Sequence, residues 1–172
     1  MVRAESDDPV ANAAHRALLH QARAAVYDLR SGQCLAARGE AAKRMPPVVS
    51  AIKAGVKVGA GTDAHRVASY NPFVVLQWLL DGRTVSGREQ RVADEIPTRE
   101  QALRLYTQGS AWFAFDEQRR GTLEPGKLAD FALLDQDITT VPVDRIGRTS
   151  SLLTVVGGQV VHTAAPFTNI KP

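Results

Sequence analysis

The sequence predicts an α/β fold with a β-rich tail, on the basis of three observations. Residues 55–81 have the pattern of a short apolar strand, a polar loop and an apolar helix, which together make one β-loop-α unit. Helical patterns lie before and after this unit. Residues 151–163 have the alternating β-branched pattern and the Gly-Gly turn of a β-hairpin.

The composition is that of an ordinary globular chain. Its 172 residues are 44% hydrophobic and 23% charged, and 21 basic against 18 acidic residues give a net charge of +3. The basic residues are scattered and aromatic residues are few, which argues against nucleic-acid binding. No apolar run approaches the ~20 residues of a membrane span, and Cys34 has no partner cysteine. We therefore expect a cytoplasmic protein that binds neither nucleic acid nor membranes.

The first predicted elements are helices. Residues 1–9 are polar, and the Ala-, Leu- and Arg-rich stretch 10–30 has the apolar spacing of an amphipathic helix. A polar piece then leads to two prolines. After them, residues 47–54 are predicted to form a short helix that is closed by Gly55.

Residues 56–60 are predicted to form a strand that ends near a carboxylate. Val56 and Val58 alternate with smaller or polar residues, and nearby glycines leave room for a close neighbour. Asp63 lies just past the end of this strand. Catalytic groups gather at the carboxyl ends of parallel strands, so Asp63 is the first candidate for chemistry. The alternative is a turn aspartate that binds the backbone amides ahead of it.

The pair Asn71-Pro72 predicts the start of a helix over residues 72–81. The Asn71 side chain can accept from first-turn amides, and Pro72 fits the first helical position, where no N–H is needed. The helix is apolar nearly all round, so we expect it to be buried between layers.

A longer helix is predicted over residues 98–114. Gly109 within it would permit the close approach of a neighbour. Trp112, Phe113 and Phe115 near its end are interpreted as core residues rather than as an aromatic box for a ligand.

The composition then changes to that of an antiparallel layer. A Pro-Gly turn at 125–126 precedes a predicted strand over 131–134. Residues 152–156 and 159–162 are expected to pair about the Gly-Gly turn at 157–158. These strands are too few to form a closed body alone.

Three stretches together carry a family resemblance. They are VGAGTDAHRVASYNP, TREQALRLYTQGSAWFAF, and the tail GTLEPGKLADFALLDQD with LLTVVGGQVVH. They resemble the carboxy-terminal portion of the amidohydrolase superfamily, specifically the amidohydrolase-3 or YtcJ-like group that includes N-substituted formamide deformylase. The resemblance runs from Ala41 to His162, and residues 1–40 match no pattern that places them.

The resemblance implies the terminal part of a (β/α)8 barrel of the TIM type over residues 41–120, with 56–60 as the last strand. It implies that 121–165 supplies carboxy-terminal strands of a composite β-sandwich domain. Residues 1–40 are then an unplaced, mostly helical segment, and 166–172 are a tail. A complete barrel takes about 250 residues, so we expect an incomplete fold.

The resemblance also implies metal-dependent hydrolysis of carbon-nitrogen bonds other than peptide bonds, of the amide or formamide type. In the family, the aspartate after the last strand binds a divalent metal, usually zinc, or lies beside it and takes the proton of the attacking water; this role falls on Asp63. Arg66, Ser69 and Tyr70 lie in the loop that would border the substrate. His65 is either a second metal ligand or a loop residue where the family has threonine.

The sequence departs from the family pattern in its metal ligands. No His-x-His occurs, and a catalytic zinc takes three protein ligands, of which Asp63 is one. We therefore expect the chain alone to be inactive and without metal, and to need a complementing amino-terminal barrel fragment or a second copy before it acts on a small-molecule amide. The alternative is a non-catalytic truncated remnant, or an interaction module that associates through strand edges without bound metal.

Overall fold

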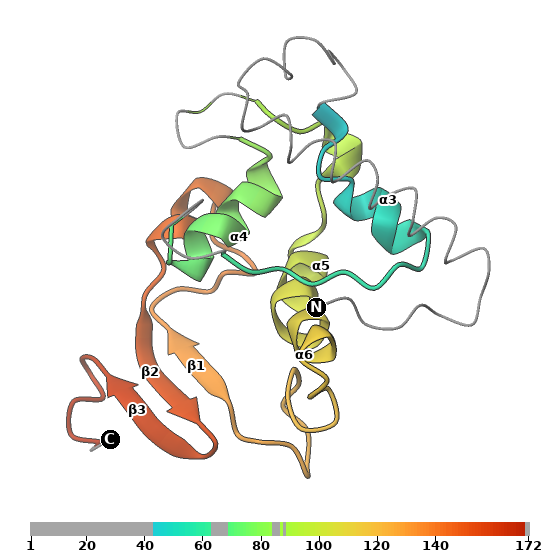
Figure 1. The fold of residues 1–172 in the computed structure, drawn as a ribbon. Coiled ribbons are helices and arrows are strands. Elements are labelled where there is room, and N and C mark those ends of the chain that lie inside the picture. The colour runs from blue at the N-terminus through green and yellow to red at the C-terminus, as the bar shows by residue number, and fades with distance from the viewer. Residues whose placement is uncertain (1–42, 63–68, 84–86, 88, 171–172) are drawn as a thin grey trace. The chain divides into compact units, whose positions relative to one another are not determined.

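The protein's structure is a computed structural model that describes residues 43–62, 69–83, 87 and 89–170 (Figure 1). These residues fall into two compact units. The first comprises the described residues up to Val58 together with Trp78–Thr98, and the second comprises Gly59–Gln77 together with the described residues from Arg99 onward. The predicted helix 10–30 lies outside the described residues.

The first unit contains α3 (Val48–Lys53) and the 3-10 turn η2 (Ala93–Glu95). Pro47 precedes α3 and offers no side-chain cap. The Glu95 carboxylate takes that role, because it accepts hydrogen bonds from the Ser50 N–H at 3.0 Å and from the Ser50 hydroxyl. Glu95 is buried, so a distant carboxylate satisfies a first-turn amide that would otherwise lack a partner. The helix predicted over 47–54 is confirmed.

The helix α4 (Pro72–Asp81) begins where the sequence predicts. The Asn71 side chain accepts a hydrogen bond from the Phe73 N–H at 2.9 Å, which confirms the predicted cap. Its burial differs from the prediction. Leu76 and Leu79 are each 4% exposed, whereas the other apolar side chains of the helix are only half-buried or exposed. The described residues therefore cover one stripe of α4 rather than its whole circumference.

A buried arginine closes the carboxyl end of α4 within the first unit. The Arg91 guanidinium lies 4.3 Å from the centre of the Trp78 ring, and its Nη1 donates to the Leu79 carbonyl at 3.1 Å. Burial lowers the pKa of Arg91, while the charges of Asp81 and Glu95 oppose that shift. Arg91 therefore binds one of the helix-terminal carbonyls that lack an intrahelical partner.

The second unit contains a continuous helical segment, which confirms the helix predicted over 98–114. It consists of α5 (Arg99–Arg104), a π-helical turn η3 (Leu105–Gly109) and α6 (Ser110–Phe113) (Figure 1). A π-turn contains one residue more than the equivalent α-turn. Among the described residues, no helix is long and apolar enough to cross a membrane.

This helix ends with a phenylalanine in a left-handed conformation. The Asp116 N–H donates to the Ala111 carbonyl at 3.0 Å and the Phe115 N–H donates to the Trp112 carbonyl at 3.1 Å, which is the Schellman pattern. Phe115 has a φ of 58°, at a position usually occupied by glycine. Phe113 and Phe115 are 40% and 50% exposed. The interpretation of these two rings as core residues is therefore wrong.

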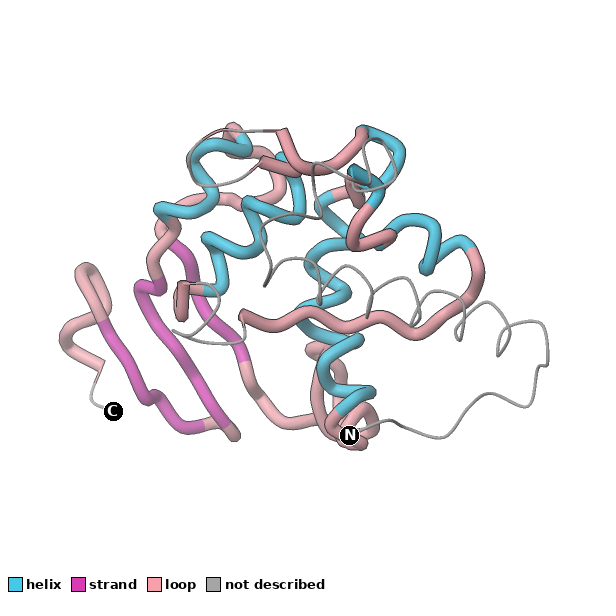
Figure 2. The backbone as a smooth tube through the Cα atoms, turned by 45° about the horizontal axis from the view of Figure 1, so that its top comes forward, coloured by secondary structure: helices cyan, strands magenta, loops and turns pink. Residues whose placement is uncertain are grey.

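An antiparallel sheet forms the tail of the second unit. Its strands are β1 (Phe131–Leu134), β2 (Ser151–Val156) and β3 (Gln159–Thr163), in the order β1-β2-β3 (Figures 1 and 2). On the central strand, Leu153 and Val155 are buried. The predicted strand 131–134 and the predicted hairpin are thus confirmed.

The 3-10 helix η4 (Val143–Arg148) lies in the connection between β1 and β2. Ile146 within it is fully buried, and the Gly147 N–H donates to Gln77 Oε1 of α4 at 2.8 Å. This side chain ties the middle of α4 to η4. The buried apolar residues of the second unit are Leu76, Ala102, Leu105, Ala111, Ile146, Leu153 and Val155.

The predicted strand over residues 56–60 is wrong. These residues follow an extended path, but no other described segment pairs with them in a ladder. Their backbone bonds go to helices: the Val56 N–H donates to the Ala51 carbonyl at 3.0 Å, and the Ala60 N–H donates to the Leu105 carbonyl at 3.1 Å. A β-strand requires a neighbouring strand, and the sequence pattern of this stretch cannot show whether one is present.

The hairpin turn is predicted to depend on both of its glycines. Gly157 and Gly158 have φ values of 59° and 81°, and positive φ costs a β-branched residue ~1–2 kcal/mol. The double change Gly157→Val with Gly158→Val should therefore unpair β2 from β3, which amide hydrogen exchange of β3 would reveal. Gly157→Asn is the control, because asparagine tolerates positive φ and should leave exchange unchanged. Unaltered protection in the double variant would contradict this account of the turn.

Candidate functional site

The segment that leads to Asp63 is fixed by the π-turn. The Ala60 N–H donates to the Leu105 carbonyl at 3.1 Å, and the Ser110 hydroxyl donates to the Ala60 carbonyl at 2.8 Å. The same hydroxyl lies 3.1 Å from the Leu105 carbonyl, but it carries one proton, and the shorter contact assigns that proton to Ala60. Both backbone groups of Ala60 are thus satisfied by the helix, at a point three residues before Asp63.

The absence of a side chain at Gly59 allows this close approach. A Cβ atom built on Gly59 would lie 3.1 Å from the Gly109 carbonyl carbon, 3.2 Å from its oxygen and 2.8 Å from a ring carbon of Phe113. The helix thus has a close neighbour at Gly109, and that neighbour is Gly59. At Gly61, by contrast, a Cβ would meet open space.

The predicted catalytic and metal-binding residue, Asp63, lies outside the described residues, as do His65 and Arg66. Their roles stay predictions. The structure does describe the backbone just before Asp63, namely Ala60, whose N–H and carbonyl are held by the helix, and the two residues that follow it.

Two predicted substrate-binding residues are described. The Ser69 hydroxyl accepts a hydrogen bond from the Asn71 N–H at 3.1 Å, so it supports the turn that starts α4. Tyr70 is 79% exposed and leaves its ring open to solvent. Neither position tests substrate binding, which stays a prediction for both residues.

The described residues do not complete a metal centre. Within residues 43–62, 69–83, 87 and 89–170, no group of three His, Cys, Asp or Glu side chains could hold a metal ion. A divalent metal of the kind the family resemblance implies would therefore need ligands from outside these ranges. Asp63 is one candidate for such a ligand.

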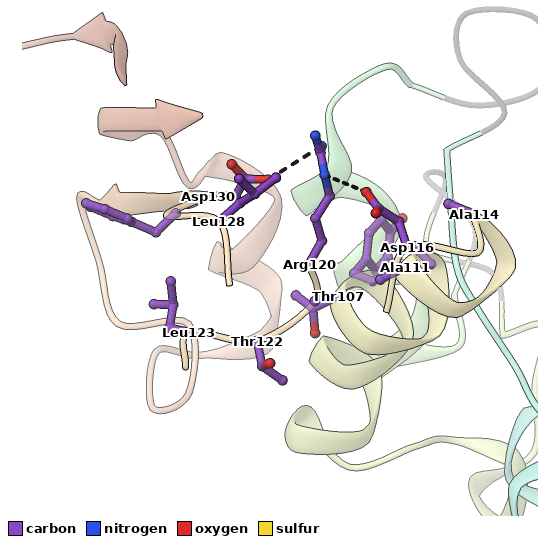
Figure 3. A pocket seen from close by; sticks show the side chains of 13 residues that line it. Thr107, Ala111, Ala114, Asp116, Arg120, Thr122, Leu123, Leu128 and Asp130 are labelled. Carbon is purple, nitrogen blue, oxygen red and sulfur yellow. Dashed lines mark ion pairs between the residues drawn. The ribbon is translucent and has the colours of Figure 1, made fainter. Parts of the chain in front are cut away.

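A pocket that the sequence did not predict lies within the second unit. Its volume is 640 Å³, and it opens between the η3-α6 part of the helix and the segment 120–131 (Figure 3). Its lining residues are Tyr106, Thr107, Ser110, Ala111, Ala114, Asp116, Arg120, Gly121, Thr122, Leu123, Leu128, Asp130 and Phe131.

Three charged side chains form the polar side of this pocket. Arg120 Nε lies 2.8 Å from an oxygen of Asp116, and Arg120 Nη1 lies 3.5 Å from an oxygen of Asp130 (Figure 3). The other Asp130 oxygen accepts the Gly157 N–H at 2.5 Å, and Arg119 approaches Asp116 to 3.6 Å. These charges gave no recognisable motif in the sequence, since the three residues are 4 and 10 positions apart.

Tyr106 places a polar atom without a partner at the same pocket. Its hydroxyl is buried and no described residue forms a hydrogen bond with it. Burial raises the pKa of Tyr106 from 10.0 to about 12, because the ionised form is penalised away from water.

Comparison with known proteins identifies the family. The chain matches the amidohydrolase family over residues 10–162 and belongs to it. It is 30% identical to the N-substituted formamide deformylase of Arthrobacter pascens over 112 residues, which are 65% of this chain and 20% of that protein. It is 27% identical to the putative amidohydrolase YtcJ of Bacillus subtilis (strain 168) over 114 residues, which are 64% of this chain and 21% of that protein. The chain thus spans about a fifth of the length of these curated relatives, and no solved structure matches it.

The family match begins farther upstream than the sequence motifs indicate. It starts at residue 10, whereas the resemblance was placed from Ala41 onward. Residues 10–40 therefore lie within the family region, although their Ala- and Leu-rich composition carries no distinctive motif.

The contact between Gly59 and Gly109 predicts a difference between two neighbouring glycines. Gly59→Ala should destabilise the protein by about 1–3 kcal/mol, because its Cβ meets a backbone carbonyl that cannot rotate away. Gly61→Ala should change stability by less than ~0.5 kcal/mol, since its Cβ meets nothing. Urea unfolding of both variants measures the difference. Equal midpoints would show that the extended segment does not pack on the helix in this way.

Tyr106 predicts a loss of stability in alkali. The folded-state pKa of about 12 exceeds the ordinary 10.0, so the folded protein holds this proton more tightly. The contribution of the protonated Tyr106 side chain to the free energy of unfolding is complete below pH 10. It declines as the pH rises towards 12. Tyr106→Phe should flatten this decline and raise stability near pH 7, because it removes a buried hydroxyl that lacks a partner. Urea unfolding at pH 7, 10 and 11 tests this, with Tyr70→Phe as the exposed control; equal slopes in both variants would contradict it.

Proposed function

We propose that this chain carries the catalytic aspartate of a metal-dependent amidohydrolase. The reaction is hydrolysis of carbon-nitrogen bonds other than peptide bonds, in substrates of the amide or formamide type. A complementing barrel portion supplies the rest of the site. Membership of the amidohydrolase family and similarity to an N-substituted formamide deformylase support this proposal.

The anchor at Ala60 is the structural observation that favours a catalytic role for Asp63. A general base must be held within hydrogen-bond distance of the proton that it removes. With both backbone groups of Ala60 bound by the helix, the chain enters the loop that carries Asp63 from a fixed point. The Asp63 carboxylate then accepts the proton of the attacking water and passes it to the leaving nitrogen.

On this proposal the chain alone has no meaningful activity. A carboxylate near neutral pH is a weak base, and amide hydrolysis also needs groups that stabilise the developing oxyanion. The described residues do not provide three ligands for a metal ion. We therefore assign no step to a metal held by this chain by itself.

The substrate-binding part of the proposal concerns Arg66, Ser69 and Tyr70, which follow Asp63 closely in the chain. Tyr70 has an exposed ring that can cover an apolar substituent of an amide. The Ser69 hydroxyl accepts the Asn71 N–H and so holds the backbone turn that contains Tyr70. Its role is to position Tyr70.

A chimera tests the proposal directly. The matching segment of the Arthrobacter pascens deformylase is replaced by the corresponding residues of this chain, and turnover of N-substituted formamides is measured with added zinc. We expect turnover by the chimera and none by the isolated chain. Asp63→Asn should reduce kcat by about 100-fold or more, because it removes the proton acceptor. Asp144→Asn, an exposed carboxylate on η4, is the matched control and should have no effect.

Two outcomes would overturn the proposal. A folded chimera that binds zinc but shows no turnover would favour a non-catalytic remnant. Robust turnover by the isolated chain that is lost in Asp63→Asn would show that the chain completes its own site, with His65 and a second copy as the candidates for the remaining ligands.

A further inference from the structure

We propose that the 640 Å³ pocket of the second unit binds a small organic ammonium ion with an apolar body. The inference goes beyond the proposed function, because it concerns residues 106–131 and uses neither Asp63 nor a metal. It depends on the size of the pocket, on the balance of its charges and on which of its polar groups are already engaged.

The pocket has the dimensions and the walls of a small-molecule site. Sites for such ligands measure roughly 300–1,000 Å³ and are lined mainly by apolar side chains. Figure 3 shows Leu123 and Leu128 on one side of the pocket and Ala111 and Ala114 on the other, with Arg120 between them. These four side chains can bury an apolar ligand body.

The charges favour a cation. Two carboxylates, Asp116 and Asp130, line the pocket together with the Arg120 guanidinium. Arg119 approaches Asp116 from outside the lining, so Asp130 is the less compensated carboxylate. The 3.5 Å contact between Arg120 and Asp130 is longer than a strong charge-assisted hydrogen bond, which measures about 2.7–2.9 Å. Asp130 therefore keeps acceptor capacity that an ammonium group can use, whereas an anionic ligand would meet two carboxylates.

Burial strengthens this preference. The side chains of Asp116 and Asp130 are 24% and 26% exposed, so their attraction for a cation is less screened than that of fully exposed carboxylates. The rings of Tyr106 and Phe131 also line the pocket and can attract a cation through their faces.

Three hydroxyl groups of the pocket already form hydrogen bonds, whereas the buried Tyr106 hydroxyl has no partner among the described residues. The Thr107 hydroxyl donates to the Leu103 carbonyl at 2.9 Å, and the Ser110 hydroxyl donates to Ala60. Thr122 accepts a hydrogen bond from the Lys127 ammonium at 2.6 Å. A neutral hydroxyl or amide could bond to the Tyr106 hydroxyl or accept the Thr122 proton, but only the carboxylates distinguish an ammonium ion from these neutral groups by charge.

The test uses three probes of similar shape and different charge. The isolated chain is titrated by calorimetry with 2-phenylethylammonium, 2-phenylethanol and phenylacetate at neutral pH, with EDTA present. The ammonium ion should bind at least about tenfold more tightly than the alcohol, and phenylacetate should bind weakest. Because no turnover is measured and metals are chelated, the result is independent of the hydrolase proposal.

Matched variants locate the binding. Asp130→Asn keeps an oxygen that can accept the Gly157 N–H but removes the charge, and should weaken 2-phenylethylammonium about tenfold. Ala114→Leu should weaken both the ammonium ion and the alcohol, because it fills the pocket from an exposed position at the end of α6. Asp144→Asn should leave all three probes unchanged. Circular dichroism confirms that each variant is folded.

The proposal is overturned if the three probes bind equally, or if wild type shows no saturable binding of 2-phenylethylammonium below about 10 mM. It is also overturned if Asp130→Asn and Asp144→Asn bind the ammonium ion alike. A normal affinity in Ala114→Leu would place the binding outside this pocket and would reject the proposal as well.

Discussion

The backbone of Ala60 is the point on which the candidate active site depends. An extended segment without a neighbouring strand leaves its N–H and carbonyl groups unpaired, and burying such groups is costly. Here the Leu105 carbonyl and the Ser110 hydroxyl replace the neighbouring strand. The replacement requires that Gly59 lack a side chain, because a Cβ there would meet the Gly109 backbone. Two hydrogen bonds and the missing side chain of Gly59 thus fix the backbone at Ala60, three residues before Asp63.

A second set of contacts fixes the wall of the pocket. Gly121 has a φ of 92°, and a Cβ built on it would lie 3.0 Å from the Ala111 Cβ and 3.1 Å from the Gln108 Cα. The chain that leaves the helix therefore passes close to the same turns that hold Ala60. Arg120, one residue earlier, reaches carboxylates on either side of this passage. The π-turn thus takes part both in the Ala60 anchor and in the lining of the pocket.

Local patterns in the sequence predicted the elements that depend on local chemistry. The Asn71 cap, the helices over 47–54, 72–81 and 98–114 and the Gly-Gly hairpin follow from turn and capping preferences that act over a few residues. The errors concern contacts between distant residues. Apolar alternation over 56–60 cannot reveal whether a partner strand exists, and three aromatic residues within four positions do not show which of them is covered. The pocket escaped prediction because residues from the helix, the loop and β1 meet only in the fold.

The π-turn η3 contains one residue more than a regular α-turn, so gain or loss of one residue at this place changes the helix only locally. A π-turn accommodates an inserted residue while the helical segments on either side keep their faces. The Leu105 carbonyl accepts the Ser110 N–H across this turn and the Ala60 N–H as well, so one oxygen serves both the helix and the segment before Asp63. Loss of one residue between Leu105 and Ser110 would close the turn to regular i to i+4 geometry and change the direction of this carbonyl, while the faces of the flanking helical segments stayed the same. A single codon therefore changes the geometry of the contact that holds Ala60 without changing which face of the helix is buried.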